Sequence, residues 1–487
     1  MAINYTKRRI SQLILLMFII ILLFTACTDP DTNENVGEPQ PSHTNDKVDY
    51  DSIVKGGGEE ADYVKQVYTS QKVIGLAFSG LREKKYMEQL MDKLDEYGMK
   101  ATFFIPGMRI AEEPDLALQI IERGHEIGNN LLTRSDPEKM SYKELFKEIH
   151  LSKQILERTT GKEVDLVRTR RGNDLSAVRQ AAAQSGSTAV VGHFMNLLDK
   201  YVDKEYSNMA YMHLELQRGS ILVADINDNE RVLEILDKLH GATTETNYAF
   251  IPIQQLLNAR LPQRKLEEIP GYNQAVMNMD YENAQYELIY NAPPGRKQVA
   301  LTIDDWGSDY IITRLLDVLE QYNVKASFFI RANGAERNPN LARAILDAGH
   351  EVASHTYSHP VITTVTPEQL QEEIVKAHRV LTEALQQAPN LLFRPPTGEI
   401  DDESAKIVAA TGYHDIAMYD VSVLDWEPGV GKDDIVNGVL EKSQDGSIVL
   451  LHMLDNLHTV DALPEIIQGL RARGLEPVTM SEMLHGR

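Results

Sequence analysis

Short apolar runs alternate with longer amphipathic segments along most of the chain, and this alternation is clearest in residues 296–354. Apolar runs of strand length there flank segments whose apolar residues recur at helical spacing. The pattern predicts strands at 299–303, 326–330 and 350–354, with helices at 310–322 and 341–348. Strand–helix alternation with short connections predicts a parallel sheet or barrel, in which chemistry gathers at the carboxyl ends of the strands.

The chain also repeats itself. The segments KATFFI and GHEI recur 225 residues later as KASFFI and GHEV, and GSIL recurs 227 residues later as GSIV. A long period that returns across a whole domain indicates two copies of one fold. We place the first copy at residues 72–260 and the second at 296–487, joined by a Pro- and Gly-rich linker at 261–295.

The N-terminal segment is typical of an export signal. A basic stretch at residues 7–9 precedes an apolar run from Leu13 to Phe24, which is shorter than the ~20 residues that span a bilayer. The run ends in Phe-Thr-Ala-Cys, which resembles the lipobox of bacterial lipoproteins and implies cleavage of residues 1–26 and a lipid on Cys27. The alternative is an uncleaved anchor. In both cases the remaining chain lies outside the cytoplasmic membrane.

Composition narrows the classes of function. Residues 27–71 are rich in polar residues, Pro and Gly, which predicts a disordered tether. The chain has 49 Lys and Arg against 72 Asp and Glu, a net charge of −23, which argues against a nucleic-acid partner. Its single cysteine excludes an intrachain disulfide and a Cys-based zinc finger.

Polar groups follow two predicted strands of the second copy. Asp304 and Asp305 end the first strand, while His355 and His359 follow the third. Two histidines four residues apart share a face if their turn is helical, so both imidazoles can then point at one ion. A carboxylate completes a His₂Asp set with open positions for water or substrate. The alternative is that the acids cap a helix and the histidines are solvated.

Five segments of the second copy together resemble the motif set of the polysaccharide deacetylases, the NodB-homology domains of carbohydrate esterase family 4. In order, they are Thr302–Asp305, His355–His359, Phe393–Gly398, Leu424–Trp426 and Leu450–His452. The resemblance implies an α/β fold with two tandem distorted (β/α) barrel domains of the NodB-homology type.

The resemblance also implies a role for each matching residue. Asp305, His355 and His359 would bind one divalent transition metal ion, zinc or, as alternatives, Co, Ni or Mn. Asp304 would be the general base and His452 the general acid, as expected for groups that move protons during amide hydrolysis. The remaining roles are orientation of Asp304 by Arg394, orientation of His452 by Asp425, and contact with substrate by Thr397, Trp426 and Leu450.

The first copy lacks most of these groups. By the repeat offsets, Ser79 and Gly80 replace the acid pair, Asn130 and Arg134 replace the two histidines, and Asp225 replaces His452. We therefore predict that residues 72–260 form a non-catalytic domain of the same fold. His125 in the first copy and His350 in the second occupy equivalent positions, so we expect both to be structural.

The leading interpretation is a metal-dependent hydrolase, lipid-anchored to the bacterial cell membrane on its outer side. It would remove acetyl groups from N-acetylated polysaccharide, either peptidoglycan or poly-N-acetylglucosamine, and release acetate. Two alternatives stay open: an O-acetyl esterase acting on a polysaccharide, and a non-catalytic glycan-binding lipoprotein. The expected partners are the acetylated polysaccharide and the membrane, and the sequence indicates no particular protein partner.

Overall fold

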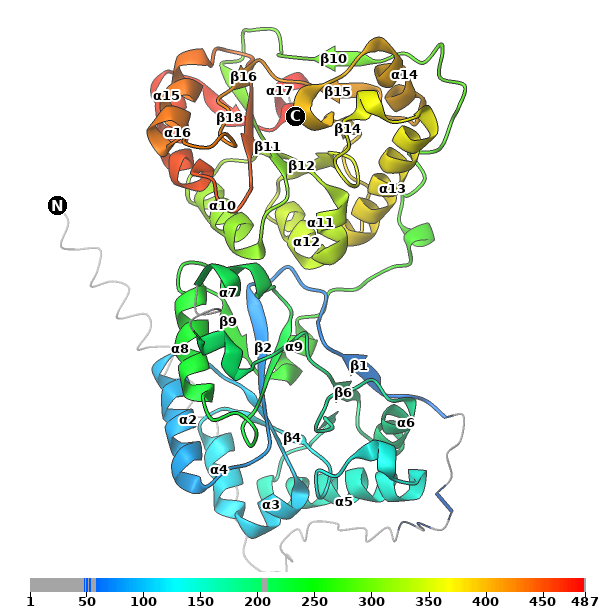
Figure 1. Ribbon diagram of the computed structural model, residues 1–487, viewed down its shortest axis with the longest axis vertical. Coiled ribbons are helices and arrows are strands. Elements are labelled where there is room, and N and C mark those ends of the chain that lie inside the picture. The colour runs from blue at the N-terminus through cyan, green and yellow to red at the C-terminus, as the bar shows by residue number, and fades with distance from the viewer. Residues whose placement is uncertain (1–47, 49, 51, 54–57, 204–208, 486–487) are drawn as a thin grey trace, which may run out of the picture. The chain divides into compact units, whose positions relative to one another are not determined.

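The computed structural model of the protein describes residues 48, 50, 52–53, 58–203 and 209–485 (Figure 1). Both copies lie within one compact unit, residues 50–487. The predicted signal peptide, Cys27 and most of the predicted tether lie outside the described residues. In the part of the chain that is described, no helix has the length and apolar character needed to cross a membrane.

The first copy is built on a nine-stranded sheet in which every pairing is parallel. The strand order is β1-β6-β5-β4-β3-β2-β8-β7, and β9 also pairs with β2. The strands are β1 Asp62–Val64, β2 Val73–Ser79, β3 Thr102–Ile105, β4 Glu126–Asn129, β5 Leu166–Val167, β6 Ala189–Val191, β7 Met195–Asn196, β8 Ile221–Asp225 and β9 Ala249–Ile251. The helices are α2 Lys84–Glu96, α3 Gly107–Glu112, α4 Pro114–Glu122, η1 Pro137–Lys139, α5 Tyr142–Thr160, α6 Ser176–Gln184, η2 Asp199–Val202, α7 Met209–Glu215, α8 Val232–Thr243 and α9 Ile253–Asn258.

The second copy repeats this architecture, with the order β10-β15-β14-β13-β12-β11-β17-β16 and β18 on β11. Its strands are β10 Glu287–Ile289, β11 Gln298–Asp305, β12 Ser327–Ile330, β13 Glu351–Ser354, β14 Leu392–Phe393, β15 Asp415–Ala417, β16 Val421–Ser422, β17 Ile448–His452 and β18 Glu476–Val478. Its helices are α10 Asp309–Gln321, α11 Ala332–Arg337, α12 Pro339–Asp347, η4 Ile362–Thr364, α13 Pro367–Leu385, η5 Pro396–Gly398, α14 Asp402–Ala410, α15 Lys432–Lys442, α16 Thr459–Ala472 and α17 Met480–His485; η3 Leu266–Glu268 precedes them. The fold is therefore α/β, with two distorted parallel half-barrel sheets, as predicted.

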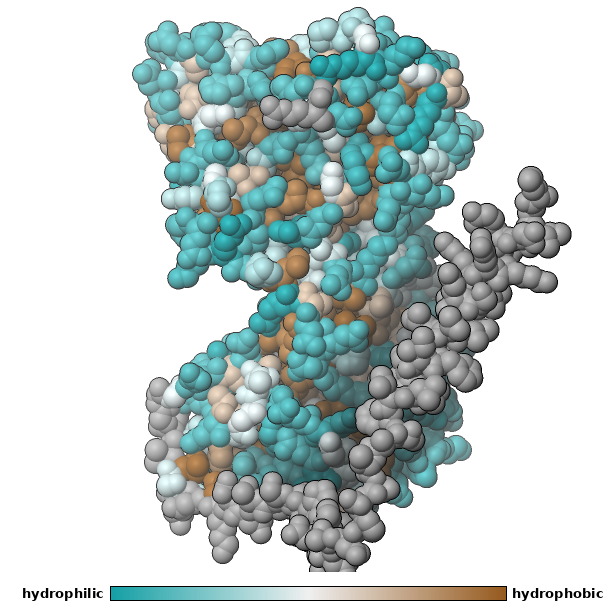
Figure 2. Space-filling view, turned by 180° about the vertical axis from the view of Figure 1, so that it is seen from behind, coloured by the Kyte–Doolittle hydropathy of each residue, from teal (hydrophilic) through white to brown (hydrophobic). Residues whose placement is uncertain are grey.

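Burial explains why these segments form strands and helices. The strands β11, β12 and β13 are buried almost throughout, as expected for a parallel sheet covered on both faces. The helix α10 buries one apolar stripe, and the Ser308 hydroxyl caps its first turn by accepting from the Ile311 N–H. Hydrophilic residues cover most of the face seen in Figure 2. The five elements predicted in residues 296–354 are confirmed within about two residues at each end.

Strand register confirms the internal repeat. Ser79 lies opposite Phe104 and Asp225 in the first sheet. Asp304 lies opposite Phe329 and His452 in the second sheet, so the positions paired by offset are also structurally equivalent.

Both copies begin earlier than the sequence pattern indicated. The strand β1, in the predicted tether, pairs with β6, and β10, in the predicted linker, pairs with β15 at the equivalent place. The expected tether is thus wrong for residues 62–71, where Val64 and Val67 are buried in the first copy. Two strands of three residues each carry too little periodicity to be recognised in sequence.

A buried ion pair joins the two copies. Arg218, just before β8, and Asp309, at the first position of α10, lie 3.0 Å apart (Nη2 to Oδ1) and are both nearly inaccessible to solvent. Asp309 also accepts hydrogen bonds from Asn338, at 3.0 Å, and from the Tyr248 hydroxyl. The Asn340 side-chain amide donates to the Arg218 carbonyl at 2.8 Å, which adds a further buried hydrogen bond between the two copies.

Candidate active site

Three potential metal ligands converge at the carboxyl ends of β11 and β13. The ligand atoms of Asp305, His355 and His359 all lie within 4.8 Å of one another, and this is the one such group found among the residues that the structure describes. The His359 Nε2 lies 3.7 Å from the Asp305 Oδ1. The segment between the histidines is not helical: it is a loop in which Thr356 and His359 adopt left-handed backbone angles, so the two rings converge by a different route from a shared helix face.

The donor set fits a divalent transition metal. The Asp305 Oδ1 is buried without a hydrogen-bond partner, which is costly unless a cation binds there. The His355 Nδ1 donates to the Arg394 carbonyl at 2.9 Å, which leaves Nε2 directed toward the other ligands. Burial lowers the pKa of His355 to about 3, so its ring is neutral and able to ligate.

Asp304 is held next to this group by a buried arginine. The Arg394 Nη1 donates to the Asp304 Oδ1 at 2.8 Å and to the Thr302 hydroxyl at 2.7 Å. The remaining guanidinium donors bind the carbonyls of Ala417 and Met418. Burial raises the pKa of Asp304, and the charge of Arg394 opposes that rise. The Asp304 Oδ2 lies 3.9 Å from the His355 Nε2, so the predicted base adjoins the ligand group.

A second charged pair approaches from β17. The His452 Nδ1 lies 2.7 Å from the Asp425 Oδ1, and the Thr459 hydroxyl donates to the Asp425 Oδ2 at 2.6 Å. Burial alone would lower the pKa of His452, but the hydrogen bond and charge of Asp425 outweigh it and the pKa is raised. Asp304 lies opposite His452 in the neighbouring strand.

The three predicted substrate contacts differ in exposure. Trp426 is 37% exposed, and its ring stands edge-on to the His452 ring, 4.6 Å away between centroids. Thr397 is exposed, whereas Leu450 is buried within β17. Sequence reasoning missed Arg331, whose Nη1 lies 3.8 Å from the Asp305 Oδ1. Its position directly after β12, at the carboxyl edge of the sheet, could have identified Arg331 from the sequence as a site residue.

Left-handed backbone angles concentrate at this site. Asp305 (φ 81°), His359 (φ 69°) and Thr397 (φ 62°) are all in this region, which costs a non-glycine residue on the order of 1–3 kcal/mol. In the first copy the position of Asp305 is taken by Gly80 (φ 103°), which adopts such angles freely. The second copy thus has a side chain with a carboxylate at a position whose backbone angles suit glycine best.

The first copy keeps the framework of this site but changes its chemistry. The Asn130 amide donates to the Arg168 carbonyl at 2.7 Å, as His355 does to Arg394. Arg134, in place of His359, forms an ion pair with Asp225, in place of His452. A guanidinium thus lies where the second copy has a potential metal ligand.

Comparisons with known proteins agree with this geometry. The family model for polysaccharide deacetylase matches residues 66–190 and again residues 291–416. A peptidoglycan-N-acetylglucosamine deacetylase of Bacillus cereus is 33% identical over 256 residues, which cover 50% of this chain and 92% of that protein. The peptidoglycan-N-acetylmuramic acid deacetylase PdaC of Bacillus subtilis is 30% identical over 190 residues, 39% of each chain.

Two solved structures are similar over single copies. The Bc1960 peptidoglycan N-acetylglucosamine deacetylase is 35% identical, with a TM-score of 0.39 over 41% of this chain and 93% of that one. BA3943 of Bacillus anthracis, described as a CE4 family pseudoenzyme, is 30% identical, with a TM-score of 0.39 over 42% of this chain and 70% of that one. Since the family model matches both copies, this chain belongs to the polysaccharide deacetylase family.

Proposed function

We propose that the second copy is a metal-dependent deacetylase that removes acetyl groups from N-acetylated peptidoglycan or a related poly-N-acetylglucosamine and releases acetate. The observation that carries the proposal is the convergence of Asp305, His355 and His359 within 4.8 Å, with Asp304 beside them and His452 opposite. The names of relatives such as the Bacillus cereus protein point to peptidoglycan as the substrate.

Asp305, His355 and His359 would hold the ion, with zinc as the first candidate. When bound, a divalent metal polarises a carbonyl oxygen and lowers the pKa of water toward neutrality. Every other group in the mechanism belongs to the second copy.

Asp304 accepts the proton of the attacking water, and Arg394 fixes the orientation of its carboxylate through the 2.8 Å hydrogen bond. The charged His452 donates a proton to the leaving nitrogen, and Asp425 holds its ring in place. A backbone N–H near Thr397 stabilises the oxyanion, while Trp426 and Leu450 line the acetyl pocket. The products are acetate and a free amino sugar.

The first copy is the non-catalytic partner in this proposal, since Ser79, Gly80, Asn130 and Arg134 offer no metal-ligand set. The N-terminal segment supports a lipid anchor at Cys27 and a location outside the cytoplasmic membrane, next to the wall glycan. Protein partners are left open.

Acetate release tests the proposal. The full chain, supplied with Zn²⁺ or Co²⁺, is incubated with N-acetylated peptidoglycan and, separately, with O-acetylated xylan. We expect acetate from the peptidoglycan and a matching loss of acetyl mass from its sugars. Acetate release from xylan alone would show that the protein is an O-acetyl esterase. Release from neither substrate would refute the proposal and favour a non-catalytic glycan-binding protein.

We predict that each chain binds one metal ion and that His355→Ala abolishes binding. The reason is that the ligand group in the second copy is the one found among the described residues. Elemental analysis after gel filtration measures the stoichiometry. A second ion per chain, or one retained by the His355→Ala variant, would contradict the prediction.

The pH dependence of kcat/KM should report on His452. Activity needs its protonated form, so activity falls as pH rises through its pKa. Because Asp425 raises that pKa, Asp425→Asn should move the alkaline limb of the profile to lower pH. An unmoved limb would show that another group donates the proton.

A further inference from the structure

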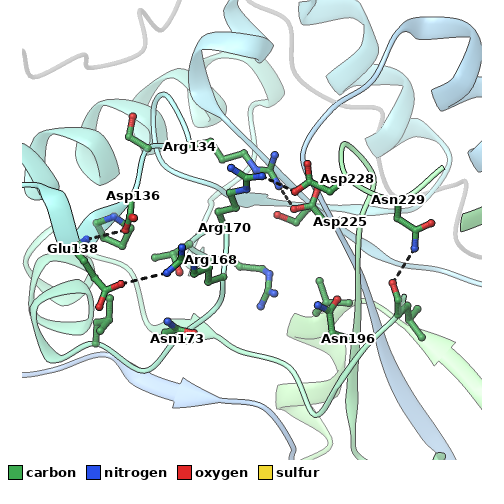
Figure 3. A pocket seen from close by; sticks show the side chains of 18 of the residues that line it. Arg134, Asp136, Glu138, Arg168, Arg170, Asn173, Asn196, Asp225, Asp228 and Asn229 are labelled. Atoms are coloured by element: carbon green, nitrogen blue, oxygen red, sulfur yellow. Dashed lines mark hydrogen bonds and ion pairs between the residues drawn. The ribbon is translucent and has the colours of Figure 1, made fainter. Parts of the chain in front are cut away.

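The first copy contains a cavity of about 590 Å³ at the carboxyl ends of its strands (Figure 3). Its lining includes Ser79, Arg134 and Asp225, the positions that correspond to Asp304, His359 and His452 of the second copy. The cavity thus occupies the place of an active site, and its volume lies in the range of small-molecule and sugar sites.

Most charges around this cavity are matched. The lining has four arginines and four acids. Arg134 pairs with Asp225, Arg170 with Asp228 at 2.7 Å, and Arg171 with Glu138 at 3.7 Å. Such pairs present both donors and acceptors to a polyhydroxylated ligand.

Arg168 is the exception. It is 2% exposed, lines the cavity, and has no carboxylate within ion-pair distance among the described residues. Its Nη1 donates to the carbonyls of Val191 and Gly192, its Nη2 lies 3.5 Å from the His193 Nδ1, and its Nε has no hydrogen-bond partner. Burial lowers the pKa of Arg168 to about 10, and the nearby charge of Asp225 opposes this only in part, as expected for a buried cation without a directly paired carboxylate.

The second copy has the carboxylate partner that Arg168 lacks. There the equivalent Arg394 forms an ion pair with Asp304 at 2.8 Å. In the first copy Asp304 is replaced by Ser79, whose shorter side chain removes the carboxylate and lines the cavity instead. A carboxylate belonging to a ligand could enter this space and take the place of the missing side chain.

We propose that this cavity binds a carboxylate-bearing sugar, with Arg168 facing the carboxylate and the paired arginines and acids facing the hydroxyl groups. The carboxylate is either a 3-O-lactyl group or a uronic acid group, since both offer the same chemistry to a guanidinium. The first copy then acts as an acidic-glycan binding domain beside the catalytic one.

The test is calorimetric titration of the full chain carrying Asp304→Asn and freed of metal with a chelator, so that acetyl removal is negligible during the titration. N-acetylmuramic acid and N-acetylglucosamine serve as a matched pair that differs in the lactyl carboxylate. We expect the acidic sugar to bind at least about tenfold more tightly, as one charge-assisted contact provides. A parallel titration with glucuronic acid decides between the lactyl and uronic sources.

Two variants tie binding to this cavity. Ser79→Asp supplies an internal carboxylate for Arg168, so it should abolish binding and raise the unfolding temperature. Asn283→Asp, the control, adds a carboxylate at an exposed position of the second copy and should leave binding unchanged. If Ser79→Asp does not fold, Arg168→Gln provides the second test and should also lose binding.

Equal binding of both N-acetyl sugars, no binding of any acidic sugar, or undiminished binding by Ser79→Asp would overturn the proposal. The titration involves no turnover, so its failure would leave the deacetylase assignment of the second copy untouched.

Discussion

Asp304→Asn should lower kcat/KM for acetate release by roughly 10²–10⁴-fold, the contribution expected of a positioned general base. The amide has almost the same shape and can still accept a hydrogen bond from Arg394, but it cannot take a proton from water. Asp304 is also the buried counter-charge of Arg394, so the exchange should lower stability as well, and circular dichroism at the assay temperature checks that the variant is folded. The measurement is the initial rate of acetate release at saturating Zn²⁺.

A matched control separates this effect from a general loss of negative charge. Asp402→Asn makes the same chemical change at an exposed carboxylate that pairs with Lys406 on α14. Its rate should stay within about twofold of wild type, since exposed ion pairs contribute little. If Asp304→Asn retained near wild-type activity while still binding its metal, Asp304 would not be the base.

Asp309→Asn should lower the free energy of unfolding by roughly 3–5 kcal/mol, because it leaves the buried Arg218 without its counter-charge. The Asn338 and Tyr248 donors that now bind a carboxylate would face a neutral amide. Urea unfolding followed by circular dichroism measures the change. The control Glu465→Gln removes an exposed pair with Lys432 and should leave the urea midpoint almost unchanged.

The same ion pair predicts a pH dependence of stability. Burial alone would raise the pKa of Asp309, but the charge and hydrogen bonds of Arg218 outweigh it and the pKa is lowered. The stabilisation is therefore fully present above the unfolded pKa of about 3.9 and is lost as pH falls toward the folded value. The difference between wild type and Asp309→Asn should shrink in that acidic range. A difference that stays constant down to the folded pKa would contradict this account.

Much of the fold was predictable because long elements repeat their pattern. Buried strands such as β11 and amphipathic helices such as α10 carry enough periodicity to be recognised in one sequence, and the repeat supplied a second reading of each. The short strands β1 and β10 carry no recognisable periodicity. The sequence pattern therefore assigned them to the tether and the linker, although both pair within the sheets. Their pairing depends on contacts more than a hundred residues away in sequence.

For the site, the sequence indicated which residues lie close together. The backbone angles that bring them together are known only from the structure. Strand ends and spacing pointed to His355, His359 and one of two neighbouring acids, the resemblance to the deacetylases chose Asp305, and the three residues do converge. The condition considered for the histidines, a helical turn, is not met, and the left-handed angles at Thr356 and His359 that bring them together depend on the surrounding loop and cannot be read from their spacing. Arg331 was missed for a related reason: an arginine after a strand has no distinctive spacing.

The ion pair between Arg218 and Asp309 also bears on how the gene can change. A deletion that removed the first copy would leave Asp309 and Asn340 without the groups that now satisfy them. The shortened product would lose stability even though its catalytic groups were intact. Selection for a folded protein would therefore be enough to preserve the first copy whether or not it performs chemistry, and the two halves would be inherited as one.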